Sequence, residues 1–170
     1  REEKISTKGE TDSIIKKIYK VNSSDLILYR NKMLLSSIKP TKIRDNSSNV
    51  YNLENFEFLI NDELLKSDKI EIVTNDEKIK SDKYFFETGF FNLKTKKFLA
   101  KDVNITFNKT MYDNSENDPR LLGVNGYGDE FYTHLEKGVF TTCKKNDKCP
   151  PWVIKAKKIK NYKINKKIIY

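Results

Sequence analysis

Apolar and polar residues alternate along most of this 170-residue chain. The clearest case is the segment 103–108, in which Val103, Ile105 and Phe107 are separated by single polar residues. A period of two is the spacing of a β-strand, whose successive side chains point to opposite faces, and helical periodicity is scarce. Similar apolar stripes comprise Phe56, Phe58 and Ile60, then Ile70 and Ile72, and later Trp152, Ile154 and Ala156.

Clusters of turn-forming residues separate these stripes, for example at 61–62, 75–76, 146–147 and 165–166. Short strands divided by turns, without helical crossovers, indicate an antiparallel all-β fold of about ten or eleven strands. Because no linker-like stretch interrupts the pattern, residues 1–170 are predicted to form one domain.

A weak internal repeat adds to this prediction. Small or charged residues stand directly before several apolar runs, in Ser24-Asp25-Leu26, Ser67-Asp68-Lys69-Ile70, Ser81-Asp82-Lys83-Tyr84, Lys101-Asp102-Val103 and, more loosely, Ala156-Lys157-Lys158-Ile159. We expect one corner, placed just before a strand, to be reused as the chain winds around a common core. The alternative is that such residues simply precede strands often in so polar a sequence.

The alternation of apolar and polar residues is interrupted between residues 111 and 138. A polar loop is expected at 113–120, and four of the six glycines follow it, at Gly123, Gly126, Gly128 and Gly138. Glycine at this density predicts a mobile or tightly turning connection, after which the strand pattern resumes at Phe131.

The net charge of +9 points to an anionic partner but not to a nucleic-acid reader. The 33 basic residues are 29 lysines and only 4 arginines, and asparagine and isoleucine each occur 17 times. All three abundant residues have A/T-rich codons, so genome composition explains much of the lysine. Arginine, which suits bidentate contacts to phosphate and guanine, is nearly absent.

Both ends of the chain resemble cuts. The sequence opens on Arg1 without a signal segment and closes on the apolar run 168–170 without a terminating turn. We therefore expect an internal fragment of a longer protein, with a fold that is incomplete at both ends. No apolar run reaches the ~20 residues of a membrane-spanning helix.

The sequence contains few residues that could form a catalytic site. Its one histidine, His134, lies in a strand-like stretch and is expected to be a packed or surface residue. The Gly126-Tyr127-Gly128 segment lacks the rest of a phosphate-binding loop. No catalytic residue, metal site or cofactor is predicted.

Two cysteines, Cys143 and Cys149, flank a polar loop before Pro150-Pro151-Trp152. Their spacing fits neither a redox pair nor a zinc site. They can form a local disulfide, each can pair with a cysteine outside this fragment, or both can remain thiols. Either disulfide requires an oxidising compartment.

The block Thr141-Thr142-Cys143, Cys149-Pro150-Pro151-Trp152 and 154–160 resembles the end of the periplasmic domain in the LptD family, also called OstA. Segments 117–121, 89–93 and 100–103 resemble the same family, and the similarity runs from about residue 20 to the end. Members of this family assemble lipopolysaccharide at the outer membrane of Gram-negative bacteria.

The resemblance implies an OstA-like β-jellyroll that is a conduit and not an enzyme. It would receive lipopolysaccharide from an LptA-like periplasmic bridge protein and pass it to its own outer-membrane barrel, which an LptE-like lipoprotein plugs. The implied location is the periplasmic face of the outer membrane. In the family, a cysteine matching Cys143 joins a disulfide to the barrel, whereas Cys149 is less general, so the pairing stays open.

A lipid conduit needs an apolar inner face. The residues expected to supply it are Phe56, Phe58, Ile60, Ile70, Ile72, Phe85, Val103, Ile105, Phe107, Trp152 and Ile154. Each can equally pack an ordinary closed core. Two other functions fit the same pattern: a stand-alone periplasmic bridge protein of the LptA or LptC type, and an all-β structural module without a lipid ligand.

Overall fold

A computed structural model of the chain describes residues 19–74, 82–109, 116–145 and 152–170. The described part is all-β, and its little helical structure is of the 3₁₀ type, as in the turn η1 (Arg30–Lys32). No helix among these residues is long and apolar enough to cross a membrane.

The strands follow one another along the chain. They are β1 (Tyr19–Ser23), β2 (Ile27–Tyr29), β3 (Leu34–Ser37), β4 (Thr41–Asp45), β5 (Val50–Leu53), β6 (Asn55–Leu59), β7 (Leu64–Val73), β8 (Lys83–Asn92), β9 (Phe98–Thr106), β10 (Arg120–Gly128), β11 (Tyr132–Thr141), β12 (Ile154–Tyr162) and β13 (Lys167–Ile169).

All thirteen described strands belong to one antiparallel sheet that does not close on itself. Six strands are halves of three longer passes, because the chain breaks its pairing between β1 and β2, between β3 and β4, and between β5 and β6. Counted as passes, the described sheet has ten members. The expected all-β class is therefore confirmed, and the architecture is compatible with a jellyroll-like fold.

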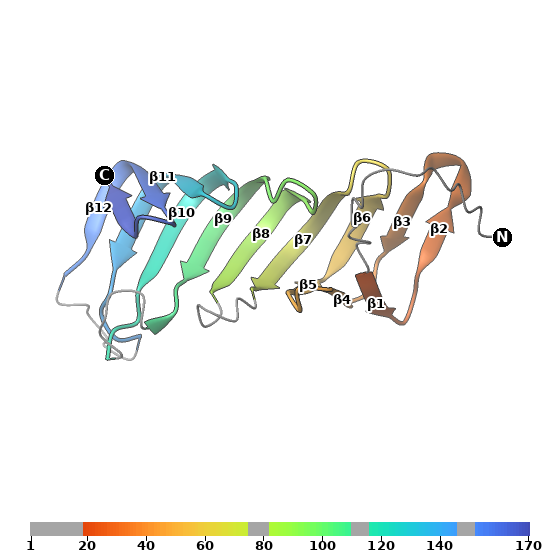
Figure 1. The fold of residues 1–170 in the computed structure, drawn as a ribbon, viewed down its shortest axis with the longest axis horizontal. Coiled ribbons are helices and arrows are strands. Elements are labelled where there is room, and N and C mark those ends of the chain that lie inside the picture. Colours follow the sequence, from red (N-terminus) through yellow and green to blue (C-terminus); the bar gives the residue numbers. More distant parts are fainter. Residues whose placement is uncertain (1–18, 75–81, 110–115, 146–151) are drawn as a thin grey trace, which may run out of the picture.

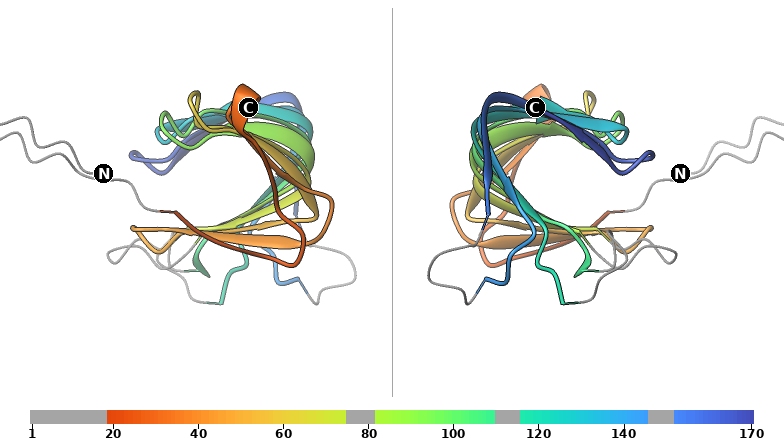
Figure 2. Two further views of the ribbon diagram at one scale, coloured as in Figure 1. Left: turned by 90° about the vertical axis from the view of Figure 1, so that its right-hand side faces the viewer. Right: turned by 90° about the vertical axis from the view of Figure 1, so that its left-hand side faces the viewer.

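The sheet is elongated and strongly curled. Its strands follow one another along the long axis, from β1 to β3 at one end to β12 and β13 at the other (Figure 1). Seen along that axis, the sheet bends back over itself into a C-shaped section (Figure 2). We call one arm the upper layer (β2, β3, β6, β13 and one half of each of β7 to β12) and the other the lower layer (β1, β4, β5 and the remaining halves). The gap in the C is the open side.

The long strands bend where the two layers join. Lys69, Asp102 and Lys137 have left-handed backbones there, with φ of 46°, 48° and 48°. At each bend two consecutive residues are exposed, so the inward-facing set changes from one parity to the other. The cross-strand register is the same on both sides of the bend, with Asp68 opposite Thr88 and Ile70 opposite Phe86, so neighbouring strands bend together without an inserted residue. The corners expected just before strands at 67–70, 101–103 and 156–159 therefore lie inside strands; the one at 81–84 precedes β8.

The glycine-rich segment is not a mobile connection. It forms the regular strand β10 and part of β11, and only its turn at 129–131 leaves the sheet. The glycines make room for inward side chains: a Cβ on Gly126 would lie 2.7 Å from Leu135 Cδ2 and 2.8 Å from Val103 Cγ2. The prediction was wrong because it read glycine as conformational freedom, whereas here the need is for close approach.

Candidate functional site

Two rows of cross-strand neighbours line the inside of the curl. The row on the lower layer, which we call the lower ladder, is apolar through nine consecutive strand passes. It consists of Val21, Ile43, Tyr51, Ile72, Tyr84, Ile105, Leu121, Phe140 and Ile154.

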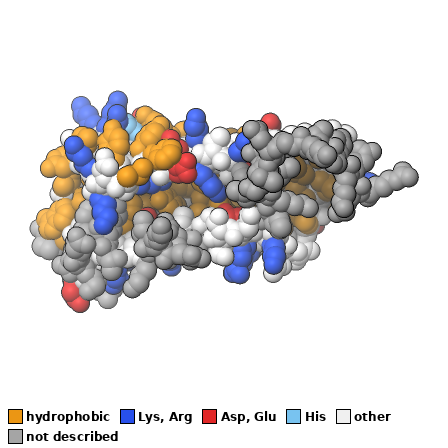
Figure 3. Space-filling model, in the orientation of Figure 1, with side chains coloured by type: hydrophobic (Ala, Val, Ile, Leu, Met, Phe, Trp, Pro, Cys, Tyr) orange, Lys and Arg blue, Asp and Glu red, His pale blue; other side chains and the backbone are white. Residues whose placement is uncertain are grey.

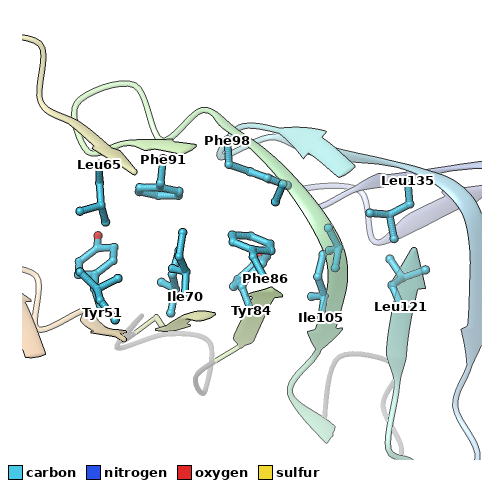
Figure 4. Close-up of a cluster of buried hydrophobic side chains, with 14 of the residues drawn as sticks. Tyr51, Leu65, Ile70, Tyr84, Phe86, Phe91, Phe98, Ile105, Leu121 and Leu135 are labelled. Atoms are coloured by element: carbon cyan, nitrogen blue, oxygen red, sulfur yellow. The ribbon is translucent and has the colours of Figure 1, made fainter. Parts of the chain in front are cut away.

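The facing row, the upper ladder, consists of Leu35, Phe58, Leu65, Phe91, Phe98, Gly128, Thr133, Asn161 and Ile168. Figure 4 shows members of both rows, with Leu65, Phe91 and Phe98 pointing toward Tyr51, Ile70 and Phe86. Phe86 and Phe98 stack across the layers with ring centroids 5.0 Å apart. The interior is thus packed by direct contact between layers.

Most of the side chains predicted to face the interior do so. Those that are buried are Phe56, Ile70, Ile72, Val103, Ile105 and Phe107. Phe58 and Ile154 are partly buried and pack against the same core, and Ile60 is partly buried in the turn after β6.

Two of the predicted residues do not face the interior. Phe85 is 38% exposed on the outer face, because Tyr84 and Phe86 take the inward positions on either side of it. Trp152 is 43% exposed and precedes β12, with the edge of its ring against Phe140. In a run of three aromatic residues, alternation alone does not fix which parity points inward.

Sequence reasoning missed much of the inner surface. The largest omissions are Tyr51, Leu65, Tyr84, Phe86, Phe91, Phe98, Leu121, Leu135 and Ile159. The exposed pairs at the bends, such as Asp68-Lys69 and Lys101-Asp102, were the available signal: each marks the point where the inward parity changes.

Side chains from the upper turns reach across the open side to tyrosines of the lower layer. Tyr19 of β1 donates a hydrogen bond to Glu63, with 3.3 Å between Oη and Oε2. Lys96 donates to the hydroxyl of Tyr51 over 3.2 Å and lies 3.7 Å from the buried carboxylate of Asp45. We call these pairs the cross-layer contacts.

Burial in this region raises the pKa of both tyrosines. Burial, reinforced by the Glu63 carboxylate, raises the pKa of Tyr19 to about 12. Burial likewise raises the pKa of Tyr51, and the Asp45 carboxylate that accepts its hydrogen bond adds to the effect. Both phenols therefore stay neutral and able to donate at physiological pH.

Lys163 makes a third contact of this kind at the other end of the molecule. It follows β12, and its ammonium lies 5.2 Å from the ring centre of Tyr84 in the lower layer. It donates a hydrogen bond to the carbonyl oxygen of Asp129. Burial lowers the pKa of Lys163 to about 8 against the opposing charges of Asp82 and Asp129.

The cysteine block forms a tight local structure at the lower end of β11. Cys143 is a buried thiol whose Sγ lies 3.4 Å from the carbonyl oxygen of Trp152, and Thr141 donates to the same oxygen over 2.8 Å. Cys149 lies outside the described residues, so the local disulfide stays a prediction.

His134 faces outward yet is only 5% exposed, because the ring of Tyr127 stacks on it at 4.7 Å. Desolvation, followed by the charges of Lys160 and Lys158, lowers its pKa. Among the described residues, no group of three or more His, Cys, Asp and Glu side chains is arranged to hold a metal ion.

The interior is the site that these observations single out. It is long, apolar and bounded by a polar margin at the open side. From that side, hydrophobic side chains gather around the C-terminal strands, with lysines at the borders (Figure 3). The sequence matches no protein-family model and none of the curated proteins.

Proposed function

We propose that this protein carries amphipathic lipid along the inside of its curled sheet, as an OstA-like transport domain whose cargo is lipopolysaccharide. The lower ladder carries the proposal, because it offers an unbroken apolar track over nine strand passes. Along one whole side of the curl, no pairing between the described strands joins the two layers (Figure 2). An ordinary β-sandwich has no need for such an open side.

The open side is the route by which acyl chains would enter. The layers are joined at the bends by continuous strands, whereas at the open side the contacts described above are made by side chains. Side-chain hydrogen bonds of this kind contribute about 1 kcal/mol each, so separating the layers there costs far less than breaking the sheet. Acyl chains would then replace contacts between the two ladders with equivalent apolar ones.

The charge fits an anionic glycolipid. The turns beside the open side carry Lys94, Lys96 and Lys97 before β9, and Lys163, Lys166 and Lys167 before or at the start of β13. Lysines so placed attract phosphates and acidic sugars without specific geometry, and salt weakens the attraction.

The edge strands of the sheet are available for pairing with the partner proteins that this function requires. β2 is exposed along its whole length, and the adjoining Leu26 and Met33 are also exposed. An open edge can pair with a strand of another jellyroll. We place an LptA-like bridge protein at one edge, and the protein's own barrel with its LptE-like lipoprotein at the other, at the periplasmic face of the outer membrane.

Site-specific photo-crosslinking tests this function. A benzophenone amino acid replaces Phe91, which lies inward on the upper ladder, and in a second variant Phe58, which is partly buried. In Gram-negative cells, irradiation should give lipopolysaccharide adducts from both positions. The matched control replaces Phe90, the next residue of β8, which is 44% exposed on the outer face and should give none.

Absence of adducts from both inner positions, in variants that fold, would overturn the conduit and favour the structural module. Adducts in a protein whose full reading frame lacks a barrel would instead identify a stand-alone bridge protein of the LptA or LptC type.

A further inference from the structure

The two ladders differ at the C-terminal end. The lower ladder stays apolar to Ile154, but the upper ladder changes character after Phe98, where Gly128, Thr133 and Asn161 follow one another across β10, β11 and β12. The interior is therefore apolar along most of its length and polar at one end of one layer.

The polar residues of this end are buried without partners. Thr133 and Asn161 are each 0% exposed and are direct cross-strand neighbours. Neither the hydroxyl of Thr133 nor either amide atom of Asn161 has a hydrogen-bond partner in the described part of the chain. Buried polar groups are normally hydrogen-bonded, because an unpaired one loses its hydrogen bonds to water and gains none within the protein. A valine and a leucine would fill the same space without that loss.

A cation lies in the adjoining turn. Lys163 follows directly after β12, two residues beyond Asn161, and its backbone N–H donates to the carbonyl oxygen of Phe131, two residues before Thr133. Its ammonium lies over the ring of Tyr84, and its pKa of about 8 reflects its removal from water. Two hydrogen-bond donors, the Thr133 hydroxyl and the Asn161 amide, together with one ammonium form a donor set for a phosphate group.

We infer that the polar end formed by Thr133, Asn161 and Lys163 binds the phosphate of an amphipathic lipid while the acyl chains lie along the apolar remainder of the interior. This inference rests on the proposed function and adds a direction to it: the phosphate lies toward β12 and the chains toward β7. The polar end would thus set the orientation of the bound lipid.

Binding of simple probes to the full chain tests the inference. The probes are dodecyl phosphate, dodecanol and inorganic phosphate, measured by calorimetry. Wild type should bind dodecyl phosphate about tenfold more tightly than dodecanol, as expected for charge-assisted hydrogen bonds, and inorganic phosphate much more weakly than either.

Two variants remove the polar groups with little change of shape, Thr133→Val and Asn161→Leu. Each should lower the affinity for dodecyl phosphate toward that for dodecanol, leave dodecanol binding unchanged, and raise the thermal midpoint. Thr141→Val is the matched control on the same strand. Its hydroxyl is hydrogen-bonded to Trp152, so this variant should lower the midpoint and keep the preference for phosphate.

The outcomes separate the two proposals. If both dodecyl probes bind and neither variant changes their affinities, the proposed role of the polar end is overturned and the proposed lipid conduit still stands. Failure of wild type to bind either dodecyl probe overturns both. Inorganic phosphate that binds as tightly as dodecyl phosphate shows a free-anion site and overturns the assignment to a lipid head.

Discussion

Lys96, in the turn between β8 and β9, donates a hydrogen bond across the open side to the hydroxyl of Tyr51 on β5, 45 residues earlier in the chain. The same ammonium lies 3.7 Å from Asp45 Oδ2, a carboxylate that also accepts hydrogen bonds from Tyr51 and Asn49. One side chain thus joins the upper layer to a buried polar group of the lower layer.

Removing this link should loosen the open side. Lys96→Met is expected to lower the free energy of unfolding by about 1 kcal/mol, because one hydrogen bond is lost while Asp45 keeps its other donors. Urea denaturation measures the change. Lys94→Met, two residues away in the same turn, is the control and should stay within about 0.5 kcal/mol of wild type. Equal effects from the two variants would mean that Lys96 does not join the layers.

Lys163 predicts a dependence of stability on alkaline pH. Its pKa is about 8 in the folded protein and 10.5 as the ordinary value, so between these limits the unfolded chain binds more protons. Stability should therefore rise with pH from about 8 to 10.5 through this group. The matched variant is Lys163→Met, which lacks the titration but keeps the tyrosines.

The measurement is the difference between the two unfolding free energies across this range. Tyr19 and Tyr51, whose pKa values are raised by burial, are present in both proteins, so their ionisation cancels in the difference. A difference that is flat from pH 8 to 10.5 would show that the Lys163 ammonium is well hydrated.

Alternation predicted the all-β class and the buried apolar residues that follow the bends of β7 and β9, because each apolar run has one parity there. It missed Leu65 and Phe98, which lie before those bends, where the inward parity is the opposite one. It failed at Phe85, where three aromatic residues in succession leave the parity undetermined. It failed again for β10, where the inward positions Gly126 and Gly128 have no side chain to show the pattern. Contacts between layers, such as Lys96 with Tyr51, depend on how far the sheet curls, which no local pattern encodes.

The close approach at Gly126 predicts a coupling between two positions. Gly126→Ala should destabilise the protein by about 1–3 kcal/mol, because the new methyl group overlaps Leu135 and Val103. Leu135→Ala should cost about 2–5 kcal/mol through the cavity that it leaves. In the double variant the alanine methyl partly fills that cavity, so the combined cost should fall below the sum of the two.

If the destabilisation of the double variant equals the sum of the two single variants, the alanine methyl at position 126 does not contact the Leu135 side chain. Gly123→Ala offers a second measurement against the same partner, since its Cβ would lie 2.9 Å from Leu135 Cβ. Its cost should persist in Leu135→Ala, because that variant keeps the Cβ atom responsible for the clash.

The bends predict a stabilising substitution. Lys137 has a left-handed backbone, with φ of 48°, and its side chain is exposed on the outer face of β11. A left-handed backbone costs a lysine about 1–2 kcal/mol and a glycine almost nothing. After allowing for the additional freedom of glycine in the unfolded chain, Lys137→Gly should stabilise the protein by about 0.5–1 kcal/mol.

Glu136→Gly is the matched control, because Glu136 is also exposed and lies one residue earlier on β11. It brings the entropic cost of glycine without relief of a left-handed backbone, and it also removes the hydrogen bond that Glu136 accepts from Asn125, so it should destabilise by about 0.5–1.5 kcal/mol. Asp102→Gly, at the equivalent bend of β9, should behave as Lys137→Gly does. If the glycines at both bends destabilise as much as the control, the strands do not bend through left-handed residues, and the curl needs another cause.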